Sequence, residues 1–447
     1  MTFFFETYGC QMNTAESAAM TEILRERGWS AAEKGEDADL VLLNTCSVRE
    51  TAEKRVLGRI AQYTALKKKR EARSFTLVVA GCMAQRIGEK LREEYRAVDY
   101  VMGTGARSVF PQILEAAEKR GPGQEAPLDP ASAEPAFAFS PFHLEKGQFR
   151  SFVPIMHGCN NYCSYCIVPY VRGREISRSP SSILEEIRLL SERGVREICL
   201  LGQNVNTYRW EEGQGVLDFP GLLELVAGAV EKTAVRWVRF LSANPKDFSS
   251  RAVRVMADNP VFCRHLHLCV QHGSDAVLKA MNRKYTRESY LALVKEIREA
   301  MPGISLSTDI LVGFPGETEE DVQLTLDLME EVKFLYAYMY HYNPREGTDA
   351  FALPNRIDDA VKRERLGRVI ALQKKHTKEL LKSRIGKQEM VLIEGISRKN
   401  ADELITRTER DEMVAVPGEA SLIGSFARVT LSSLRGNTFR AKRPDFL

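Results

Sequence analysis

The sequence lacks any apolar run long enough to cross a bilayer. A transmembrane helix needs about 20 consecutive apolar residues, and no stretch of this 447-residue chain comes near that length. The first residues, MTFFFETYGCQMN, also lack a basic segment and a small-residue cleavage site. They predict a first β-strand rather than a signal peptide. We therefore expect a cytoplasmic protein.

The sequence also lacks the even number of cysteines that a framework of disulfide bonds would need. The 9 cysteines stand at positions 10, 46, 82, 159, 163, 166, 199, 263 and 269. An odd number in a long chain without an export signal disfavours disulfides and favours metal or redox chemistry. Charge adds little, because the net charge is only +3.

What the sequence has is the composition of an ordinary globular protein, with 44% apolar and 28% charged residues. Its length predicts two to four domains. In residues 1–120, the strand-like runs FFFETYG, DLVLLNT, TLVVAG and VDYVMG alternate with helical patterns. This alternation predicts a doubly wound parallel sheet. Residues 121–147 are rich in proline and predict a linker.

A longer strand–helix rhythm follows in residues 148–378. Six strand candidates occur there: FVPIMHG, REICLLG, RWVRFLS, HLHLCV, ISLSTDILVG and FLYAYMY. They predict a partial (β/α)6 barrel related to the eightfold one, closed by a long helix near residues 357–385. The tail, residues 379–447, is β-rich with glycine turns and predicts a small β-barrel of OB-like size. The expected fold class is therefore a multidomain α/β protein.

Three cysteines follow three strands of the first predicted sheet. Cys10 comes after FFFETYG, Cys46 after DLVLLNT and Cys82 after TLVVAG. The carboxyl ends of parallel strands share one edge of a sheet, where ligands bind. A buried cysteine is often only a small apolar residue. Three at successive strand ends nevertheless favour a metal site.

A second group, Cys159, Cys163 and Cys166, follows the first strand of the predicted barrel. Active sites of such folds lie at this carboxyl end. A structural zinc site normally has four ligands, and no second pair of ligands stands at suitable spacing here. A cubane iron–sulfur cluster held by three thiolates keeps one iron free for a substrate or cofactor.

The CxxxCxxC spacing resembles the radical S-adenosylmethionine superfamily. Together with TYGCQMN, NTCSVRE, AGCMAQR and CNNYCSYCIVPYVRGREISR, it resembles the methylthiotransferases within that superfamily. The match is closest to the tRNA 2-methylthio-N6-isopentenyladenosine synthases, the MiaB group. It covers essentially the whole chain, and the C-terminal barrel resembles a TRAM domain, which implies RNA binding.

This resemblance implies S-adenosylmethionine and two 4Fe-4S clusters as cofactors. It implies a radical cluster on Cys159, Cys163 and Cys166, and an auxiliary, sulfur-carrying cluster on Cys10, Cys46 and Cys82. The cofactor-binding positions that it implies are Tyr165, Gly202, Gln203, Asn204, Gln271 and Asp309. It further implies that sulfur and methyl are inserted at carbon 2 of an adenosine next to the anticodon.

The implied partners are a tRNA anticodon stem-loop and a low-potential electron donor of the flavodoxin or ferredoxin type. A stacked adenine must leave its stack to reach the clusters, and loop recognition uses phosphate contacts and stacking. The tail offers basic residues for phosphate contacts, and each of them could equally be part of a solvated surface: Arg428, Arg435, Arg440, Lys442 and Arg443. Three arginines past the radical cysteines, Arg172, Arg174 and Arg178, could hold phosphate or cofactor, or pair with carboxylates such as Glu175.

The run Cys263, His265, His267 and Cys269 imitates a metal motif. Alternate residues of a strand stand about 6.5–7 Å apart, so four of them cannot surround one ion, and we interpret the run as a barrel strand. Where the family usually has HLPVQSGS, this chain has HLCVQHGS, with Cys269 and His272 altered. NPREG also differs from the usual SPRPGT, which weakens any substrate contact expected there.

Two other functions stay open at this point. One is methylthiolation of threonylcarbamoyladenosine in tRNA, or of a ribosomal-protein aspartate. The other is of a different class, an RNA-binding scaffold with structural zinc.

Overall fold

The computed structural model describes residues 1–47, 50–69, 75–104, 109–119, 148–213, 215–398, 400–442 and 445–446. The predicted linker, residues 121–147, lies outside the described residues, as does Arg443. Within the described part of the chain, no helix has both the length and the apolar character needed to cross a membrane.

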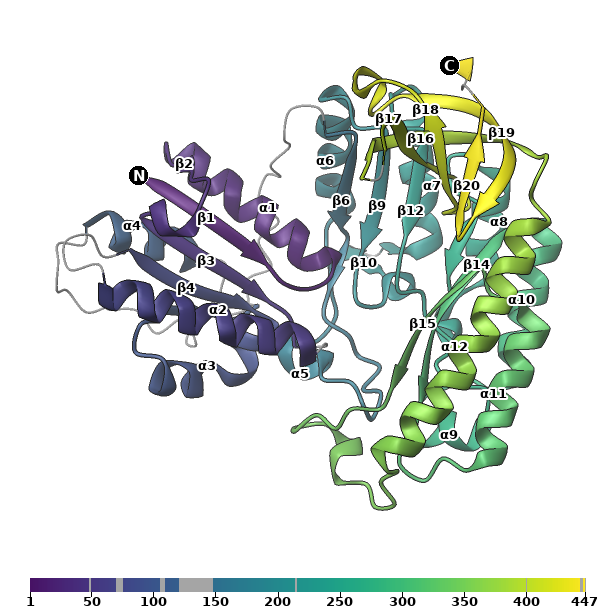
Figure 1. The fold of residues 1–447 in the computed structure, drawn as a ribbon, viewed down its shortest axis with the longest axis horizontal. Helices are drawn as coiled ribbons and strands as arrows, with labels where there is room; N and C mark the ends of the chain where they lie inside the picture. The colour runs from purple at the N-terminus through teal and green to yellow at the C-terminus, as the bar shows by residue number, and fades with distance from the viewer. Residues whose placement is uncertain are drawn as a thin grey trace.

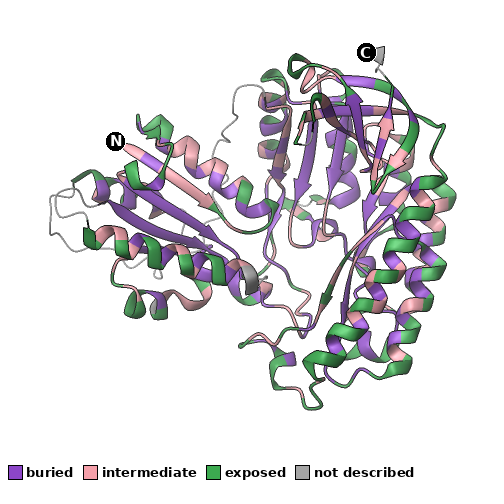
Figure 2. Cartoon of the chain, viewed as in Figure 1, coloured by how far each residue is buried: buried purple, intermediate pink, exposed green. Residues whose placement is uncertain are grey.

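The N-terminal part is a five-stranded parallel sheet with helices on both faces, as predicted (Figure 1). The strand order is β2-β1-β3-β4-β5. The elements are β1 (Thr2–Thr7), α1 (Gln11–Glu26), β2 (Ser30–Ala31), β3 (Leu40–Thr45), α2 (Glu50–Lys69), β4 (Thr76–Gly81), α3 (Cys82–Glu94), β5 (Tyr100–Met102) and α4 (Phe110–Lys119). Helices α1 and α4 cover one face and α2 and α3 the other. Strands β3 and β4 are buried along their whole length (Figure 2), which explains their continuous apolar runs.

The central part contains the six predicted strands as two three-stranded parallel sheets, β12-β9-β6 and β13-β14-β15. Single parallel bridges, Val238 with Phe262 and Ala243 with Leu268, connect the two sheets into a partial barrel. The strands are β6 (Arg150–Pro154), β9 (Glu197–Leu201), β12 (Trp237–Phe240), β13 (His265–His267), β14 (Ser305–Val312) and β15 (Tyr336–His341). Short strands β7 (Met156–His157) and β8 (Ile176–Ser177) pair beside the mouth.

Helices follow these strands and cover the outside of the partial barrel. They are α5 (Val168–Arg172), α6 (Pro180–Glu192), α7 (Phe219–Val230), α8 (Ser250–Asp258), α9 (Asp275–Ala280), α10 (Arg287–Ala300) and α11 (Glu319–Val332). Leu266 and Leu306 lie in the core beneath the helices. The alternate positions of β13, β14 and β15, including His267, Ser307 and Tyr338, form what we call the inner face. A hairpin of β10 (Arg209–Glu212) and β11 (Gly215–Asp218) was not predicted.

The C-terminal part begins with α12 (Asp359–Lys382), which matches the predicted long helix. A small barrel follows, in which β16 pairs with both β17 and β19 and so closes the sheet. Its strands are β16 (Gln388–Ser397), β17 (Asn400–Thr408), β18 (Met413–Pro417), β19 (Phe426–Arg435), β20 (Thr438–Ala441) and β21 (Asp445–Phe446). Buried Glu197 of β9 accepts hydrogen bonds from Arg407 of β17 at 2.8 and 3.0 Å, which fixes this barrel to the central part.

Candidate functional site

The first cysteine triad lies where the N-terminal sheet meets the central part. Cys10 is the N-cap residue of α1, Cys46 directly follows β3, and Cys82 is the first residue of α3. All three stand at the carboxyl edge of the sheet, and in Figure 1 the arrowheads of β1, β3 and β4 point toward the central part, near α5. Cys10 and Cys46 both lie close enough to Cys82 to act on its charge. The carboxyl ends of the parallel strands share one edge of the sheet, and this edge carries three cysteines that are far apart in sequence.

A pair of buried asparagines holds this edge in place. Asn13, in the first turn of α1, donates to Asn44 Oδ1 at 3.0 Å and to the Thr45 carbonyl at 3.1 Å. Asn44, in β3, donates back to the Asn13 carbonyl at 2.9 Å. The Asn13 amide oxygen also accepts from the Cys10 backbone and thiol, each at 3.3 Å. Sequence analysis missed both asparagines, although a polar residue at the end of an apolar strand was a usable signal.

Cys82 follows a glycine that no other residue could replace without strain. Gly81 has a φ of +95°, and a Cβ there would lie 2.5 Å from the Thr45 carbonyl oxygen. Only glycine adopts such a conformation at low cost. Burial raises the pKa of the Cys82 thiol to about 11. A thiolate therefore forms there readily only beside a compensating positive centre, such as a metal cluster.

Arg172 of α5 supplies positive charge at the same place. Its Nη1 donates to Glu16 of α1 at 2.8 Å, and both side chains are only 3% exposed. Its Nη2 is buried and has no hydrogen-bond partner among the described residues. Cys82 and Cys10 lie within its electrostatic reach. A buried guanidinium N–H with no acceptor, next to two thiols, fits an anionic sulfur cluster on this triad.

A second hydrogen-bond network lies beside Cys46, at Ser47. Glu53 of α2 accepts from the buried hydroxyl of Ser47 at 2.8 Å and from Arg86 of α3 at 2.8 Å. Arg345 of the NPREG loop donates to the same carboxylate at 3.0 Å. The loop that departs from the family pattern therefore contacts the N-terminal part.

The second triad lies in the loop between β7 and α5. Gly158, just before it, has a φ of +78°, and a Cβ there would lie 2.0 Å from the Arg174 carbonyl oxygen. Between Cys163 and Cys166, Ser164 donates its backbone N–H to the Met281 carbonyl at 3.0 Å, so the turn after α9 supports the loop.

Burial perturbs the thiols of this loop as well. It raises the pKa of Cys159 to about 11 and that of Cys166 to about 12. Each thiol therefore needs a neighbouring cation in order to ionise.

Arg283, in the loop between α9 and α10, contacts Cys163, the second cysteine of this triad. Its Nη1 lies 3.1 Å from Cys163 Sγ, and its Nη2 donates to the Cys269 carbonyl at 3.0 Å. Its Nε donates to the Tyr285 hydroxyl at 2.9 Å, and that hydroxyl donates to the Val270 carbonyl at 2.7 Å. Sequence analysis missed Arg283 because nothing local to NRKYT indicates a cysteine 120 residues away.

The two triads approach each other across α5. Cys82 packs with Ile167 and Val171 in one small buried cluster. Ile167 is the residue directly after Cys166. The chain directly after the last cysteine of the second triad therefore packs against a cysteine of the first triad.

Of the expected cofactor-binding residues, three follow β9 and face the cysteine loop. Gln203 Oε1 accepts from the Gly158 N–H at 2.6 Å. A Cβ at Gly202 would lie 2.5 Å from the Met156 side chain. Asn204 is buried, and its Oδ1 has no hydrogen-bond partner among the described residues. An orphaned acceptor at this position is able to bind an ammonium group.

The other three expected residues lie in the cysteine loop (Tyr165), after β13 (Gln271) and in β14 (Asp309). Tyr165 packs against Val277, Met281 and other apolar residues. Gln271 has a φ of +68° and donates its backbone N–H to the Asp309 carbonyl at 2.9 Å. Asp309 points onto the inner face, where its side chain is 30% exposed.

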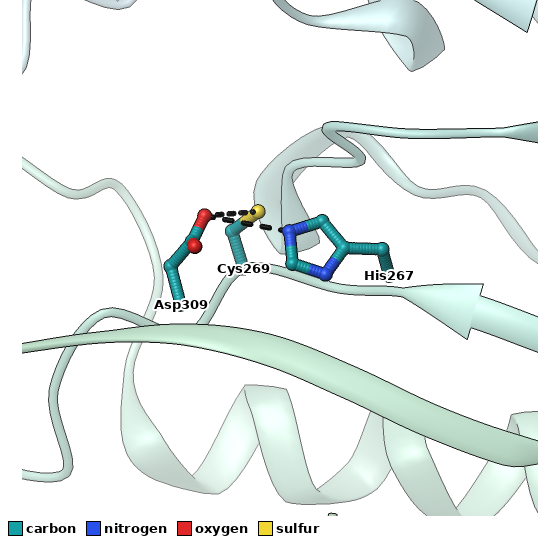
Figure 3. Close-up of side chains that lie close together, drawn as sticks. All are labelled: His267, Cys269 and Asp309. Atoms are coloured by element: carbon teal, nitrogen blue, oxygen red, sulfur yellow. Dashed lines mark hydrogen bonds and ion pairs between the residues drawn. The ribbon is translucent and has the colours of Figure 1, made fainter. Parts of the chain in front are cut away.

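Asp309 meets two residues of the CxHxHxC run (Figure 3). Its Oδ2 lies 3.3 Å from Cys269 Sγ and 3.4 Å from His267 Nε2. Cys263 lies apart from them, packed with Trp237 and Phe426. The run is a barrel strand over His265–His267, as interpreted. The spacing of alternate residues along a strand suggested that their side chains stay apart. The long imidazole of His267 nevertheless brings its Nε2 within 4.8 Å of Cys269 Sγ, two residues further along the chain.

Distances separate the triads from a single-ion site. In a tetrahedral zinc site with Zn–S bonds near 2.3 Å, the sulfurs stand about 3.8 Å apart. We compared the ligand atoms of His, Cys, Asp and Glu side chains among the described residues. One group of three has all its ligand atoms within 4.8 Å of one another, and it consists of His267, Cys269 and Asp309. Neither cysteine triad meets that limit.

The described basic residues that could bind phosphate divide into three kinds. Arg172 and Arg178 are buried, and Arg178 bonds to Glu186 and Ser182, so neither is placed to meet RNA. Arg440 is paired with Glu403. Exposed residues are Arg174, Arg428, Arg435 and Lys442.

Three family models match the chain. The model described as "Uncharacterized protein family UPF0004" matches residues 2–103, the Radical SAM superfamily model matches residues 153–329, and the TRAM domain model matches residues 382–442. These matches agree with the predicted multidomain α/β fold, with its radical SAM core and C-terminal TRAM barrel.

A solved structure supports the fold. The radical S-adenosylmethionine methyltransferase TsrM from Kitasatospora setae, solved with cobalamin and a [4Fe-4S] cluster bound, superimposes with a TM-score of 0.59 at 17% identity. The match covers 78% of this chain and 77% of that one.

Relatives of known name resemble the chain over nearly its full length. A tRNA-2-methylthio-N(6)-dimethylallyladenosine synthase of Treponema denticola is 51% identical, covering 99% of both chains. Proteins of the same name from Bacteroides thetaiotaomicron and Thermoanaerobacter are 42% and 41% identical, each covering 98% of this chain and 95% and 92% of their own. Both cysteine triads lie where the N-terminal part meets α5 of the central part, which we call the joint. From the identity and coverage of these relatives, the chain belongs to the tRNA-2-methylthio-N(6)-dimethylallyladenosine synthase family.

Proposed function

We propose that this protein is a tRNA methylthiotransferase that inserts sulfur and a methyl group at carbon 2 of isopentenyladenosine at position 37, next to the anticodon. The observation that carries the proposal is the pair of cysteine triads on either side of α5, joined by Cys82, Ile167 and Val171. One base held at this joint would reach both. The full-length relatives with this name favour the same substrate.

The proposal divides the work among three parts of the chain. Residues 1–120 carry the sulfur, residues 148–378 generate the radical, and residues 379–447 bind RNA. Residues 121–147 connect the first two parts.

In the radical part, Cys159, Cys163 and Cys166 would hold a 4Fe-4S cluster and leave its fourth iron for S-adenosylmethionine. Arg283 stabilises negative charge on Cys163 through its 3.1 Å contact. Gln203 fixes the start of the cysteine loop by accepting from Gly158.

Residues around the mouth would bind S-adenosylmethionine. The orphaned Asn204 Oδ1 is placed to accept from its ammonium group. Tyr165 would contact the adenine. Three further positions complete the proposed cofactor site: Gly202, Gln271 and Asp309.

In the N-terminal part, Cys10, Cys46 and Cys82 would hold the auxiliary 4Fe-4S cluster. The Asn13–Asn44 pair keeps two of these cysteines on adjoining elements, and Arg172 Nη2 is available to donate to a bound sulfur. When bound, the clusters and S-adenosylmethionine supply the radical, the sulfur and the methyl group, because acid–base groups cannot activate an aromatic C–H bond. The chain's own residues orient the base and exclude water.

The TRAM barrel would hold the anticodon stem-loop, with phosphate contacts from exposed Arg428, Arg435 and Lys442. The electron donor would be a flavodoxin or ferredoxin, because the radical cluster must receive one electron for each cleavage. The tRNA substrate implies a cytoplasmic location.

The decisive experiment is mass spectrometry of tRNA from a strain that lacks the gene. We expect 2-methylthio-isopentenyladenosine to be replaced by isopentenyladenosine, and to return with the wild-type gene but not with Cys46→Ala or Cys163→Ala. Cys263→Ala is the matched control, since Cys263 is a buried cysteine outside both triads. Unchanged 2-methylthio content in the deletion strain would reject the proposal.

Two measurements separate the alternatives. A loss of methylthio groups from threonylcarbamoyladenosine or from a ribosomal-protein aspartate would transfer the activity to those substrates. An RNA-binding zinc scaffold predicts zinc and no sulfide in anaerobically purified protein, whereas two cubane clusters predict about eight irons per chain.

A further inference from the structure

We infer that His267, Cys269 and Asp309 form a binding site for one divalent cation of the zinc class, distinct from both cysteine triads. The site lies on the inner face of the partial barrel (Figure 3). It uses none of the six triad cysteines, and it shares one residue, Asp309, with the proposed S-adenosylmethionine site.

The three ligand atoms have the spacing of a single-ion site. Cys269 Sγ lies 3.3 Å and His267 Nε2 lies 3.4 Å from Asp309 Oδ2, and all three atoms lie within 4.8 Å of one another. With bonds of about 2.3 Å to sulfur and about 2.0–2.2 Å to nitrogen and oxygen, a tetrahedral zinc ion has ligand–ligand distances of about 3.3–3.6 Å. The donor set of nitrogen, sulfur and oxygen is one that zinc accepts.

The histidine has the outer contact that metal-binding histidines usually have. Its second ring nitrogen, Nδ1, lies 3.0 Å from the Ser307 hydroxyl on β14. Such a partner fixes the ring so that the other nitrogen faces the metal. The Tyr338 ring packs edge-on against the same imidazole, with centroids 5.6 Å apart.

The other two ligands are also held. Arg283 donates to the Cys269 carbonyl at 3.0 Å, and the Tyr285 hydroxyl lies 3.2 Å from the same oxygen. Asp309 lies in the middle of an eight-residue strand.

An ion could enter and find an open coordination position. The Asp309 side chain is 30% exposed, and Tyr338 beside it is 52% exposed. Three protein ligands leave the fourth position of a tetrahedral ion for water or for a ligand from the barrel interior. Cys269 stands where the family usually has proline, so the thiolate ligand is an unusual feature of this chain.

The test uses the full-length chain, reconstituted without oxygen so that the triad cysteines are occupied by iron and sulfide. The protein is equilibrated with chelator-buffered Zn²⁺, and zinc and iron per chain are then measured by mass spectrometry. Zinc-edge X-ray absorption counts the sulfur ligands. The variants are Cys269→Ser and His267→Gln, with Cys263→Ser as control because that buried cysteine is six positions earlier and outside the group.

We expect one zinc per wild-type chain at unchanged iron content, with one sulfur ligand at about 2.3 Å and the remaining ligands nitrogen or oxygen. Both variants should lose this zinc while the control keeps it. Absence of bound zinc, zinc with three or four sulfur ligands, or zinc unaffected by both variants would overturn the inference. A variant that also loses iron has lost its fold, and the absorption spectrum of the wild-type protein then decides alone.

Discussion

Removing Arg172 should open the joint between the N-terminal and central parts. Arg172 of α5 and Glu16 of α1 form an ion pair at 2.8 Å, with both side chains only 3% exposed. Removing one partner of a buried pair leaves an uncompensated charge and costs about 3–5 kcal/mol. Since about 1.4 kcal/mol is a factor of ten, Arg172→Met should raise the local opening equilibrium between about 10²-fold and about 4 × 10³-fold.

Hydrogen exchange followed by mass spectrometry measures this opening, because amides in α1 and α5 exchange from the locally opened state. We expect these amides to exchange faster by that factor, while amides of the TRAM barrel stay unchanged. Arg188→Met is the matched control. Arg188 pairs with Glu185 and Glu192 on the exposed face of α6, where we expect no measurable effect.

The double variant Arg172→Met/Glu16→Leu tests the cause. If the loss of the arginine beside the buried Glu16 carboxylate produces the destabilisation, removing that carboxylate as well should restore much of the protection. An acceleration below tenfold in Arg172→Met, or a double variant that is as unstable as the two single effects added together, would refute the reasoning.

Three further predictions concern the radical triad and the N-terminal sheet. Gly158→Ala should lower the iron content after reconstitution, because its Cβ would lie 2.0 Å from a carbonyl oxygen; unchanged iron would contradict this. Arg283→Gln should lower the reduction potential of the radical cluster, seen in an EPR-monitored titration, because a positive charge beside the sulfur favours the reduced state. Burial acts to raise the pKa of Glu6, but hydrogen bonds from Arg59 and Tyr63 outweigh it and lower that pKa. Its stabilising effect is therefore present above the ordinary glutamate range and lost as the pH falls through the lowered pKa, so acid should destabilise wild type more than Glu6→Gln in urea titrations.

The local sequence was enough to predict most strands of the two sheet-containing parts and to group the cysteines into two sets. Apolar runs of strand length gave β3, β4 and the six barrel strands, because fully buried parallel strands need continuous apolar residues. Cys10, Cys46 and Cys82 could be grouped in advance, since the carboxyl ends of parallel strands share one edge. CxxxCxxC needed no tertiary information at all, because its three thiols lie within one loop.

The partners of the charged and polar residues were decided only by the tertiary structure. Arg172 meets Glu16, 156 residues away, rather than the nearby Glu175, and Arg283 meets Cys163 across 120 residues. The sequence predicted His267 and Cys269 only as part of a strand. The tertiary structure adds Asp309 of β14, whose carboxylate contacts both side chains. Hydrophobic periodicity reports which face of an element is buried, but not which element covers it. The packing of whole domains selects those side-chain partners.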